Sequence, residues 1–536
     1  MNIKLLSLTL ILVLLCSFTP QEPVSIKVDA TKNLSKLDPF WASQIIHPTE
    51  FLLTGWGNNF IKLLKESGAA RQYIRIYNQP ETAIRISADG KISYNWSNFD
   101  RMANMILSTG NNLKVVFFAM PFELAVHPEA VRKRPYGALV CSSPPKDYKQ
   151  WEELCADFTR HVIGKYGIDE VRQWTFRCWN EPDGSSFWYK GDLKEYLKLY
   201  DYFAKGVKGV NQDIKIGAPA LTSTGTFNKP ENFRFFLEHV VNGVNNATGE
   251  TGSPIDYIAV HTYGGSSAGG GPGREFPEVE YIMEQQMMYA DMRDQYPSLK
   301  DIPIHVEEWG LSSGGTTGLE KKPSADIRNS QYGAAFLTTL VAKHVQLRLE
   351  NDRKIESFTF CSSGYETIPT HDFMGYRTFD TKNGFHKPVL NAYKLLFRLA
   401  PDLIPVKMDA ENKHITAFAT SDSKKITIVV TNFQNNRIFN DGQSYPVTLS
   451  ITQPWKSGKK VTVNHWRIDN DHSNSYSIFK KLGSPILPNP LEVDAIKKRM
   501  DLELLVPSKQ TTAKEISDIK FELPCNAVSL IEIIKN

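Results

Sequence analysis

The sequence lacks the features that mark small stapled, metal-binding or nucleic-acid-binding proteins. Its 536 residues include only 6 cysteines, with no CxxC pair or Cys/His cluster. This argues against a zinc site and against a dense disulfide framework. Lysine and arginine number 62 against 58 aspartate and glutamate, and the resulting net charge of +4 is too small to indicate a nucleic-acid partner. No internal repeat or low-complexity tract is present, and 41% apolar and 22% charged residues are ordinary globular usage.

Long apolar runs are also missing, apart from one near the N-terminus. The run 5–15 is shorter than the roughly 20 residues of a membrane-spanning helix, and Lys4 precedes it. Together they predict a secretory signal peptide over residues 1–20, with an uncleaved anchor or a buried helix as alternatives. Cys16 is a candidate for lipid modification, although Leu15 before it is larger than such sites usually have. We expect a secreted, periplasmic or outer-surface protein that meets a membrane only through a lipid anchor at Cys16; its oligomeric state stays open.

Apolar strand-like runs alternate with amphipathic helical runs through most of the chain. Eight strand candidates occur, at 40–46, 73–77, 114–120, 171–180, 214–219, 257–263, 304–309 and 357–362. Helical spacing of apolar residues lies between them, for example at 98–108, 151–166 and 193–210. The alternation predicts a (β/α)8 TIM barrel over residues 43–400. A doubly wound sheet is the weaker alternative, because no GxGxxG opens a helix after a first strand.

The pattern changes at about residue 401. From 401 to 536, short alternating runs are separated by Asn, Asp, Gly and Pro, which predicts an accessory β-sandwich. Residues 21–42 form an N-terminal segment, within which 28–30 is expected to add a strand to the sandwich. The glycine-rich stretch 264–273 follows a strand end and is expected to be a flexible loop over the active face.

Two glutamates lie at the ends of expected barrel strands. Glu181 belongs to Trp179-Asn180-Glu181-Pro182, after the fourth strand, and Glu308 belongs to Val306-Glu307-Glu308-Trp309, which closes the seventh. Catalytic groups of barrel enzymes lie at these carboxyl ends. A single glutamate there is usually a surface or salt-bridged residue. Two of them, each beside a tryptophan, favour the paired carboxylates that glycoside hydrolysis requires.

The order of several motifs resembles glycoside hydrolase family 39, the family of β-xylosidases and α-L-iduronidases. The matching segments are Phe118-Ala119-Met120-Pro121, Trp179-Asn180-Glu181-Pro182-Asp183 with Phe187-Trp188, Ile216-Gly217-Ala218-Pro219, His261-Thr262-Tyr263, Pro303–Trp309 and Phe385-His386-Lys387-Pro388. The Trp-Asn-Glu-Pro element alone would imply only the wider clan of barrel glycosidases. The resemblance implies a retaining enzyme without a metal or organic cofactor, acting on an oligosaccharide or polysaccharide.

Carried over to this sequence, the resemblance implies that Glu181 is the general acid/base and Glu308 the nucleophile. Glu307 is the competing candidate, but neighbours on a strand face opposite sides, so only one of the two faces the mouth. A retaining pair of carboxyl groups lies roughly 5 Å apart and leaves no room for a water between them. Asn180 would hydrogen-bond the sugar 2-hydroxyl.

Further sugar contacts follow from the same resemblance. His261 and Tyr263 would line the pocket for the terminal sugar, with Tyr263 bonded to the nucleophile. Trp309 would supply a sugar-stacking face, with a place in the barrel core as its alternative. Glu366 is the candidate for a sugar-binding carboxylate near the last strand.

Departures from the family pattern fall in the part of the pocket that selects the sugar. The Arg-x-His-Gly of the xylosidases reads Arg75-Ile76-Tyr77-Asn78 here, so Tyr77 replaces a histidine that contacts the sugar. We expect an exo-acting β-D-xylosidase on plant oligosaccharides or polysaccharide side chains, with an α-L-arabinoside, a β-galactoside or a uronide as alternative substrates. A non-catalytic carbohydrate-binding protein on the same scaffold is the alternative from another class. The intact Glu181 and Glu308 argue against it, and an adhesion role would rest on the C-terminal module alone.

Overall fold

The computed structural model describes residues 23–68, 71–137, 139–223, 229–266, 270–315, 317–363, 368–436 and 441–536. The predicted signal peptide with Cys16, part of the glycine-rich stretch 264–273, and Glu366 lie outside these residues. Among the described helices, none is both long enough and apolar enough to span a membrane.

Within the described ranges, eight parallel strands close into the predicted barrel, because β12 pairs with both β11 and β13. They are β3 (Ser43–Ile46), β4 (Tyr73–Tyr77), β7 (Asn112–Phe117), β10 (Thr175–Cys178), β11 (Lys215–Pro219), β12 (Tyr257–Tyr263), β13 (Ile304–Gly310) and β15 (Thr359–Ser363). A short strand, β14 (Ile355–Glu356), adds to β13. The strand expected at 171–180 begins only at Thr175, because the residues before it form the short helix α5 (Ile168–Val171).

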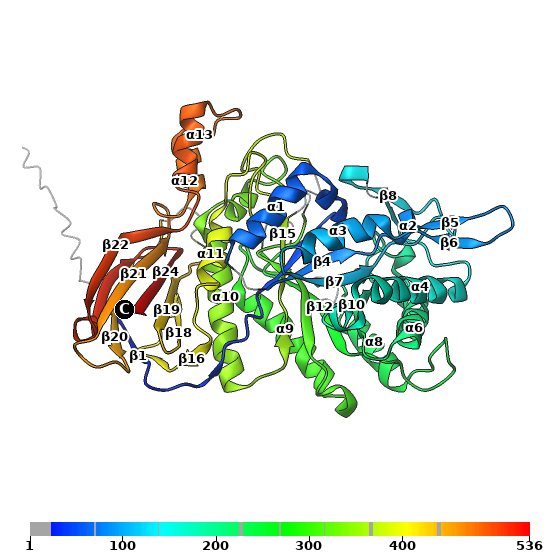
Figure 1. The fold of residues 1–536 in the computed structure, drawn as a ribbon, viewed down its shortest axis with the longest axis horizontal. Coiled ribbons are helices and arrows are strands. Elements are labelled where there is room, and N and C mark those ends of the chain that lie inside the picture. The colour runs from blue at the N-terminus through cyan, green and yellow to red at the C-terminus, as the bar shows by residue number, and fades with distance from the viewer. Residues whose placement is uncertain are drawn as a thin grey trace, which may run out of the picture.

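Helices surround this barrel in Figure 1. They are α1 (Gly55–Glu66), α3 (Ser97–Leu107), α4 (Tyr148–Tyr166), α6 (Leu193–Val210), α8 (Pro230–Asn242), α9 (Val279–Asp294), α10 (Gln331–Glu350) and α11 (Pro388–Leu396), with the single turn α2 (Pro80–Ala83). In α6, the Asp192 carboxylate caps the helix by accepting from the backbone N–H groups of Lys194 and Glu195. Apolar residues at helical spacing, such as Tyr196 and Tyr200, are buried.

Two short hairpins project from loops after barrel strands. One is formed by β5 (Ile84–Ile86) and β6 (Ile92–Tyr94), which follow β4. The other is formed by β8 (Val131–Lys133) and β9 (Leu139–Cys141), which follow β7. The second hairpin lies at the carboxyl end of the barrel, where it contributes side chains to the site described below.

The C-terminal module consists of two β-sheets beside the barrel (Figure 1). Their strand orders are β17-β1-β20-β23 and β2-β16-β18-β19-β24-β21-β22. The strands are β1 (Val24–Asp29), β2 (Ser35–Lys36), β16 (Asp402–Ile404), β17 (Val406–Met408), β18 (Ile415–Ser421), β19 (Lys425–Asn432), β20 (Tyr445–Thr452), β21 (Lys460–Ile468), β22 (Glu503–Thr512), β23 (Asp518–Leu523) and β24 (Ala527–Lys535). The N-terminal segment supplies β1, between β17 and β20, and β2, which pairs with β16.

The C-terminal module packs against helix α10 of the barrel. The rings of Tyr332 and Phe433 meet with their centroids 5.1 Å apart, and the hydroxyls of Thr339 and Thr431 are 2.7 Å apart. Two helices that the sequence pattern did not predict, α12 (Ser475–Lys481) and α13 (Pro490–Lys497), interrupt the module and project from it in Figure 1. A capping box at Asn489 begins α13.

Candidate active site

Glu181 lies on the loop that follows β10, at the carboxyl end of the barrel. The backbone N–H of Trp179 donates to the Phe117 carbonyl at 3.1 Å, and that of Glu181 donates to the Ala220 carbonyl at 3.0 Å. Trp179 and Glu181 both have left-handed backbone, with φ of 63° and 49°. Such strain costs about 1–3 kcal/mol per residue and persists only where the surroundings enforce it, often at active sites. The bonds to the neighbouring strand ends hold Glu181 at the barrel mouth.

Glu307 and Glu308 both point into the barrel, at different depths. The ladder between β12 and β13 shifts register, so that Val260 pairs with Val306 but His261 pairs with Glu308. Glu307 is therefore the extra residue of a β-bulge, which re-aims side chains that simple alternation would place on opposite faces. The Glu307 carboxylate accepts from Lys114 Nζ at 2.6 Å in the barrel interior. Glu308 faces the cavity at the mouth.

Both carboxylate oxygens of Glu308 accept hydrogen bonds. Arg75 Nη2 donates to Oε1 at 2.6 Å, and the Tyr263 hydroxyl donates to Oε2 at 2.8 Å. Arg377 Nη1 donates to the Tyr263 oxygen at 2.8 Å, which directs the tyrosine proton toward Glu308. Burial alone would raise the pKa of Glu308, but the N–H of His261 and the charges of Arg75 and Arg377 outweigh it and hold that pKa well below its usual value. Glu308 is therefore ionised at neutral pH.

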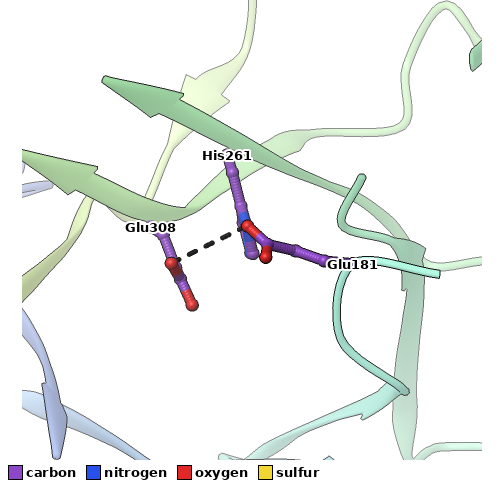
Figure 2. A group of neighbouring side chains, drawn as sticks. All are labelled: Glu181, His261 and Glu308. Atoms are coloured by element: carbon purple, nitrogen blue, oxygen red, sulfur yellow. Dashed lines mark hydrogen bonds and ion pairs between the residues drawn. The ribbon is translucent and has the colours of Figure 1, made fainter. Parts of the chain in front are cut away.

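His261 is fully buried and lies between the two glutamates, as Figure 2 shows. Its Nδ1 is 2.9 Å from Glu181 Oε1 and 3.8 Å from Glu308 Oε2. On the other side of the ring, Arg177 Nη1 is 3.1 Å from Nε2. Because a guanidinium only donates, Nε2 of the neutral ring accepts and Nδ1 carries the proton. The geometry thus assigns an N–H of His261 that donates to Glu181.

The two glutamates are close enough to act on one bond. One oxygen of each and a ring nitrogen of His261 all lie within 4.8 Å of one another. Retaining glycosidases place their carboxyl groups about 5–5.5 Å apart, whereas inverting enzymes need about 6.5–9.5 Å. The same three side chains are also of the types that bind metals. However, His261 presents an N–H to this space, and Arg75 and Arg377 add positive charge, so the arrangement suits an ionised carboxylate better than a cation.

A cavity of about 280 Å³ opens above the two glutamates. Its walls include Asn180, Glu181, Phe187, Thr222, Tyr263, Glu308 and Cys361, together with His47, Arg132, Arg134 and Arg377. The last four residues were not predicted from the sequence. Their signal was present, since each is a basic or titratable side chain in the segment that follows a barrel strand, but many residues of such segments have no role.

Residues 24–513 match a family model described as Glycosyl hydrolases family 39. The chain belongs to glycoside hydrolase family 39. A β-xylosidase of Caldicellulosiruptor saccharolyticus is 26% identical over 498 residues, which cover 90% of this chain and 92% of that protein. An α-L-iduronidase of Mus musculus is 24% identical over 509 residues, which cover 88% and 74%.

Solved structures share the fold of this family 39 chain. A monomeric β-xylosidase from Caulobacter crescentus CB15 has a TM-score of 0.78 at 20% identity, over 96% of this chain and 99% of that one. Together with the family match, this confirms the predicted barrel class. The chain is a glycosidase.

Several expected sugar contacts of this family 39 glycosidase lie at the cavity. Asn180 and Tyr263 are in its wall, and Asn180 Oδ1 accepts from Arg177 Nη2 at 3.0 Å. His261 lies behind the two carboxylates instead of in the wall. The Tyr77 hydroxyl is 2.9 Å from His47 Nδ1, so Tyr77 supports a wall residue from behind.

Trp309 does not supply the sugar-stacking face that the resemblance implied. It is fully buried, and its ring meets those of Phe360 and Phe358 at centroid distances of 5.0 and 6.2 Å. Phe360 in turn contacts Tyr393 of α11 at 5.6 Å. Because Glu308 turns toward the cavity, the next residue along the strand packs between the barrel and its helices. The aromatic side chains that do line the cavity include Phe187, Tyr263 and Tyr376.

Proposed function

We propose that this family 39 chain is a retaining exo-glycosidase that releases terminal sugars, with β-D-xylosidase as its leading activity on plant oligosaccharides or polysaccharide side chains. The observation that carries the proposal is the pair Glu181 and Glu308, whose oxygens lie within 4.8 Å at one cavity. The β-xylosidase relative, which matches 92% of its own length, supports xylose as the first sugar to test.

In the first step, the Glu308 carboxylate attacks the anomeric carbon while protonated Glu181 donates to the leaving oxygen. The bond to the leaving group breaks as the bond from Glu308 to the sugar forms. Arg75 and Tyr263 hold the two Glu308 oxygens in place and keep the group ionised. The product of this step is a covalent glycosyl-enzyme.

In the second step, Glu181 acts as the base. It takes a proton from water, the water oxygen attacks the anomeric carbon, and Glu308 leaves as a carboxylate. The His261 N–H at 2.9 Å stabilises the charged form of Glu181 that exists between the two steps. Two inversions give overall retention of configuration.

The size of the cavity supports exo action. Its volume of about 280 Å³ lies near the lower limit of small-molecule sites, which span roughly 300–1,000 Å³. A cavity of this size suits one or a few sugar residues better than a long polymer. That fit favours release of a terminal unit.

A panel of aryl glycosides tests the proposal. The β-xyloside, α-L-arabinoside, β-galactoside, β-glucoside and an iduronide are compared by kcat/KM, and NMR follows the configuration of the first product. We expect the β-xyloside to be cleaved best, with retention. A different preferred glycoside would reassign the sugar. A Glu181→Gln, Glu308→Gly double variant prepared in parallel is the control. If wild type cleaves none of the glycosides faster than this control, the result would favour a binding protein.

A further inference from the structure

Two arginines, Arg132 and Arg134, line the cavity but take no part in the proposed reaction. Arg132 lies in β8, and Arg134 follows directly after it. Arg377, from the segment after β15, acts instead on the hydrogen bond between Tyr263 and Glu308. Arg132 and Arg134 are two residues apart at the end of β8, a spacing that places side chains on the same face of extended backbone.

Both arginines flank the ring of Phe187. Their guanidinium carbons lie 4.5 Å (Arg132) and 5.8 Å (Arg134) from its centroid. Phe187 belongs to the loop that carries Glu181, and its carbonyl accepts from Trp179 Nε1 at 2.9 Å. In the proposed mechanism Glu181 protonates the leaving oxygen, so the leaving group lies on its side of the cavity. Phe187 and the nearer Arg132 are therefore held on the leaving-group side, and Arg134 reaches from there to His47.

Within the part of the chain that the structure describes, the charge of Arg134 is not matched by an acidic partner. Its guanidinium contacts His47 Nε2, and no carboxylate of the residues described in the structure lies within ion-pair distance of it. Burial and the neighbouring Arg134 charge hold the pKa of His47 well below its usual value, so His47 is neutral. The charge of Arg134 also acts to lower the pKa of Glu50, but burial outweighs that attraction and raises the pKa of Glu50.

We propose that Arg132, Arg134 and Phe187 form an anion-binding subsite for the leaving group, so that the sugar displaced from the cleaved bond carries a carboxylate or a sulfate ester. Guanidinium groups bind both anions through paired, charge-assisted hydrogen bonds. The Phe187 ring offers an apolar face to the sugar that bears the anion. This inference rests on the proposed function, because the role of Glu181 defines the leaving-group side.

The test uses three disaccharides with the same terminal sugar, chosen as the one that the aryl glycoside panel identifies. Their second sugar is neutral, a uronic acid or a sulfated sugar. We expect wild type to cleave at least one acidic disaccharide with a kcat/KM about 10-fold or more above the neutral one, as hydrogen bonds to a charged group allow. The preferred anion distinguishes a carboxylate from a sulfate ester.

Three variants locate the effect. Arg132→Gln and Arg134→Gln should each lose most of the preference for the acidic disaccharide. Lys133→Gln, which removes the same charge from the exposed residue between them, should keep it. Equal kcat/KM on all three disaccharides in wild type would overturn the subsite, as would an equal loss of preference in all three variants.

Failure of the subsite and failure of the proposed function give different results. If neutral aryl glycosides are cleaved without any preference for an acidic leaving group, the glycosidase proposal stands and the subsite falls. If no glycoside is cleaved, titration calorimetry with the uronic-acid and sulfated disaccharides still tests the subsite. Binding that Arg134→Gln weakens about 10-fold or more would support it, and absence of binding would overturn it.

Discussion

Two clusters of charged side chains lie one above the other in the barrel. The mouth cluster consists of Glu181, His261 and Glu308, and the interior cluster of Glu307, Lys114 and Arg177. The two glutamate side chains of the mouth cluster are 15% and 11% exposed. The interior side chains are 0% (Glu307), 2% (Lys114) and 1% (Arg177) exposed. Both clusters combine glutamate with basic or titratable nitrogen side chains, but they differ in their access to the cavity.

The comparison shows that a lowered carboxyl pKa does not by itself mark a catalytic group here. Burial would raise the pKa of Glu307, but the charges of Lys114, Arg177 and Arg75 lower it to about 2. Glu308 has a lowered pKa for similar reasons. Glu307, however, has no route to the cavity and joins β7 to β13 through Lys114. The interior cluster helps to position the mouth cluster, because Arg177 also sets the ring orientation of His261.

Glu308→Gly should give the largest effect on activity, and it should distinguish the mouth cluster from the interior cluster. Loss of the nucleophile should lower kcat/KM on the order of 10⁴-fold or more without unfolding the barrel. Azide fits the vacated space and should restore part of the activity on an activated aryl glycoside, giving a glycosyl azide of inverted configuration. Product analysis by NMR checks this. Rescue in Glu307→Gly, and none in Glu308→Gly, would exchange the roles of the two neighbours.

Glu181→Gln should depend on the leaving group. An amide cannot donate the acidic proton, so substrates with poor leaving groups should slow by about 10²- to 10⁴-fold. Activated aryl glycosides need little protonation and should slow far less in the first step. Pre-steady-state rates on a series of aryl leaving groups measure the difference. A uniform loss across the series would contradict the role of Glu181 as the acid.

Glu307→Gln should act on stability. Breaking a buried ion pair costs about 3–5 kcal/mol, which urea unfolding detects as a lower midpoint. An exposed control, Glu231→Gln, should stay within about 0.5 kcal/mol of wild type.

The pH dependence of stability gives the same variant a second readout. The pKa of Glu307 is about 2 in the folded protein against an ordinary value of 4.5. Its contribution to stability is therefore present above pH 4.5 and lost as the pH falls toward 2. Glu307→Gln should flatten the stability curve in that window. An unchanged slope would show that Glu307 does not titrate with folding.

The barrel and the glutamate pair could be predicted from the sequence because both depend on local order. Eight apolar runs at barrel spacing indicate the fold, and Glu181 and Glu308 each follow such a run. The choice of Glu308 over Glu307 needed the family resemblance. The β-bulge opposite Val260 and His261 lies in the pairing of two strands, which neither strand reveals alone.

Other parts of the site depend on contacts that only folding creates. Trp309 follows Glu308 directly in sequence, but it packs against Phe360 in the core. Arg134 and His47 meet across 87 residues of chain. Nothing in the local pattern around either residue predicts that meeting. The sequence therefore predicted the meeting of Glu181 and Glu308 at the barrel mouth better than it predicted the cavity walls around them.

Arg377→Gln should give the smallest effect, and it acts on the mouth cluster alone. Arg377 helps lower the pKa of Glu308 and holds the Tyr263 hydroxyl toward it. Without that charge the pKa of Glu308 should rise, so the nucleophile becomes protonated, and activity is lost, at a higher pH during acidification. We expect the acidic limb of kcat/KM to move upward by less than about one pH unit. The exposed control Arg101→Gln should leave the limb in place. An equal loss at every pH, with the limb unmoved, would show that Arg377 acts on the substrate and not on Glu308, because only a change at the nucleophile alters the pH at which it ionises.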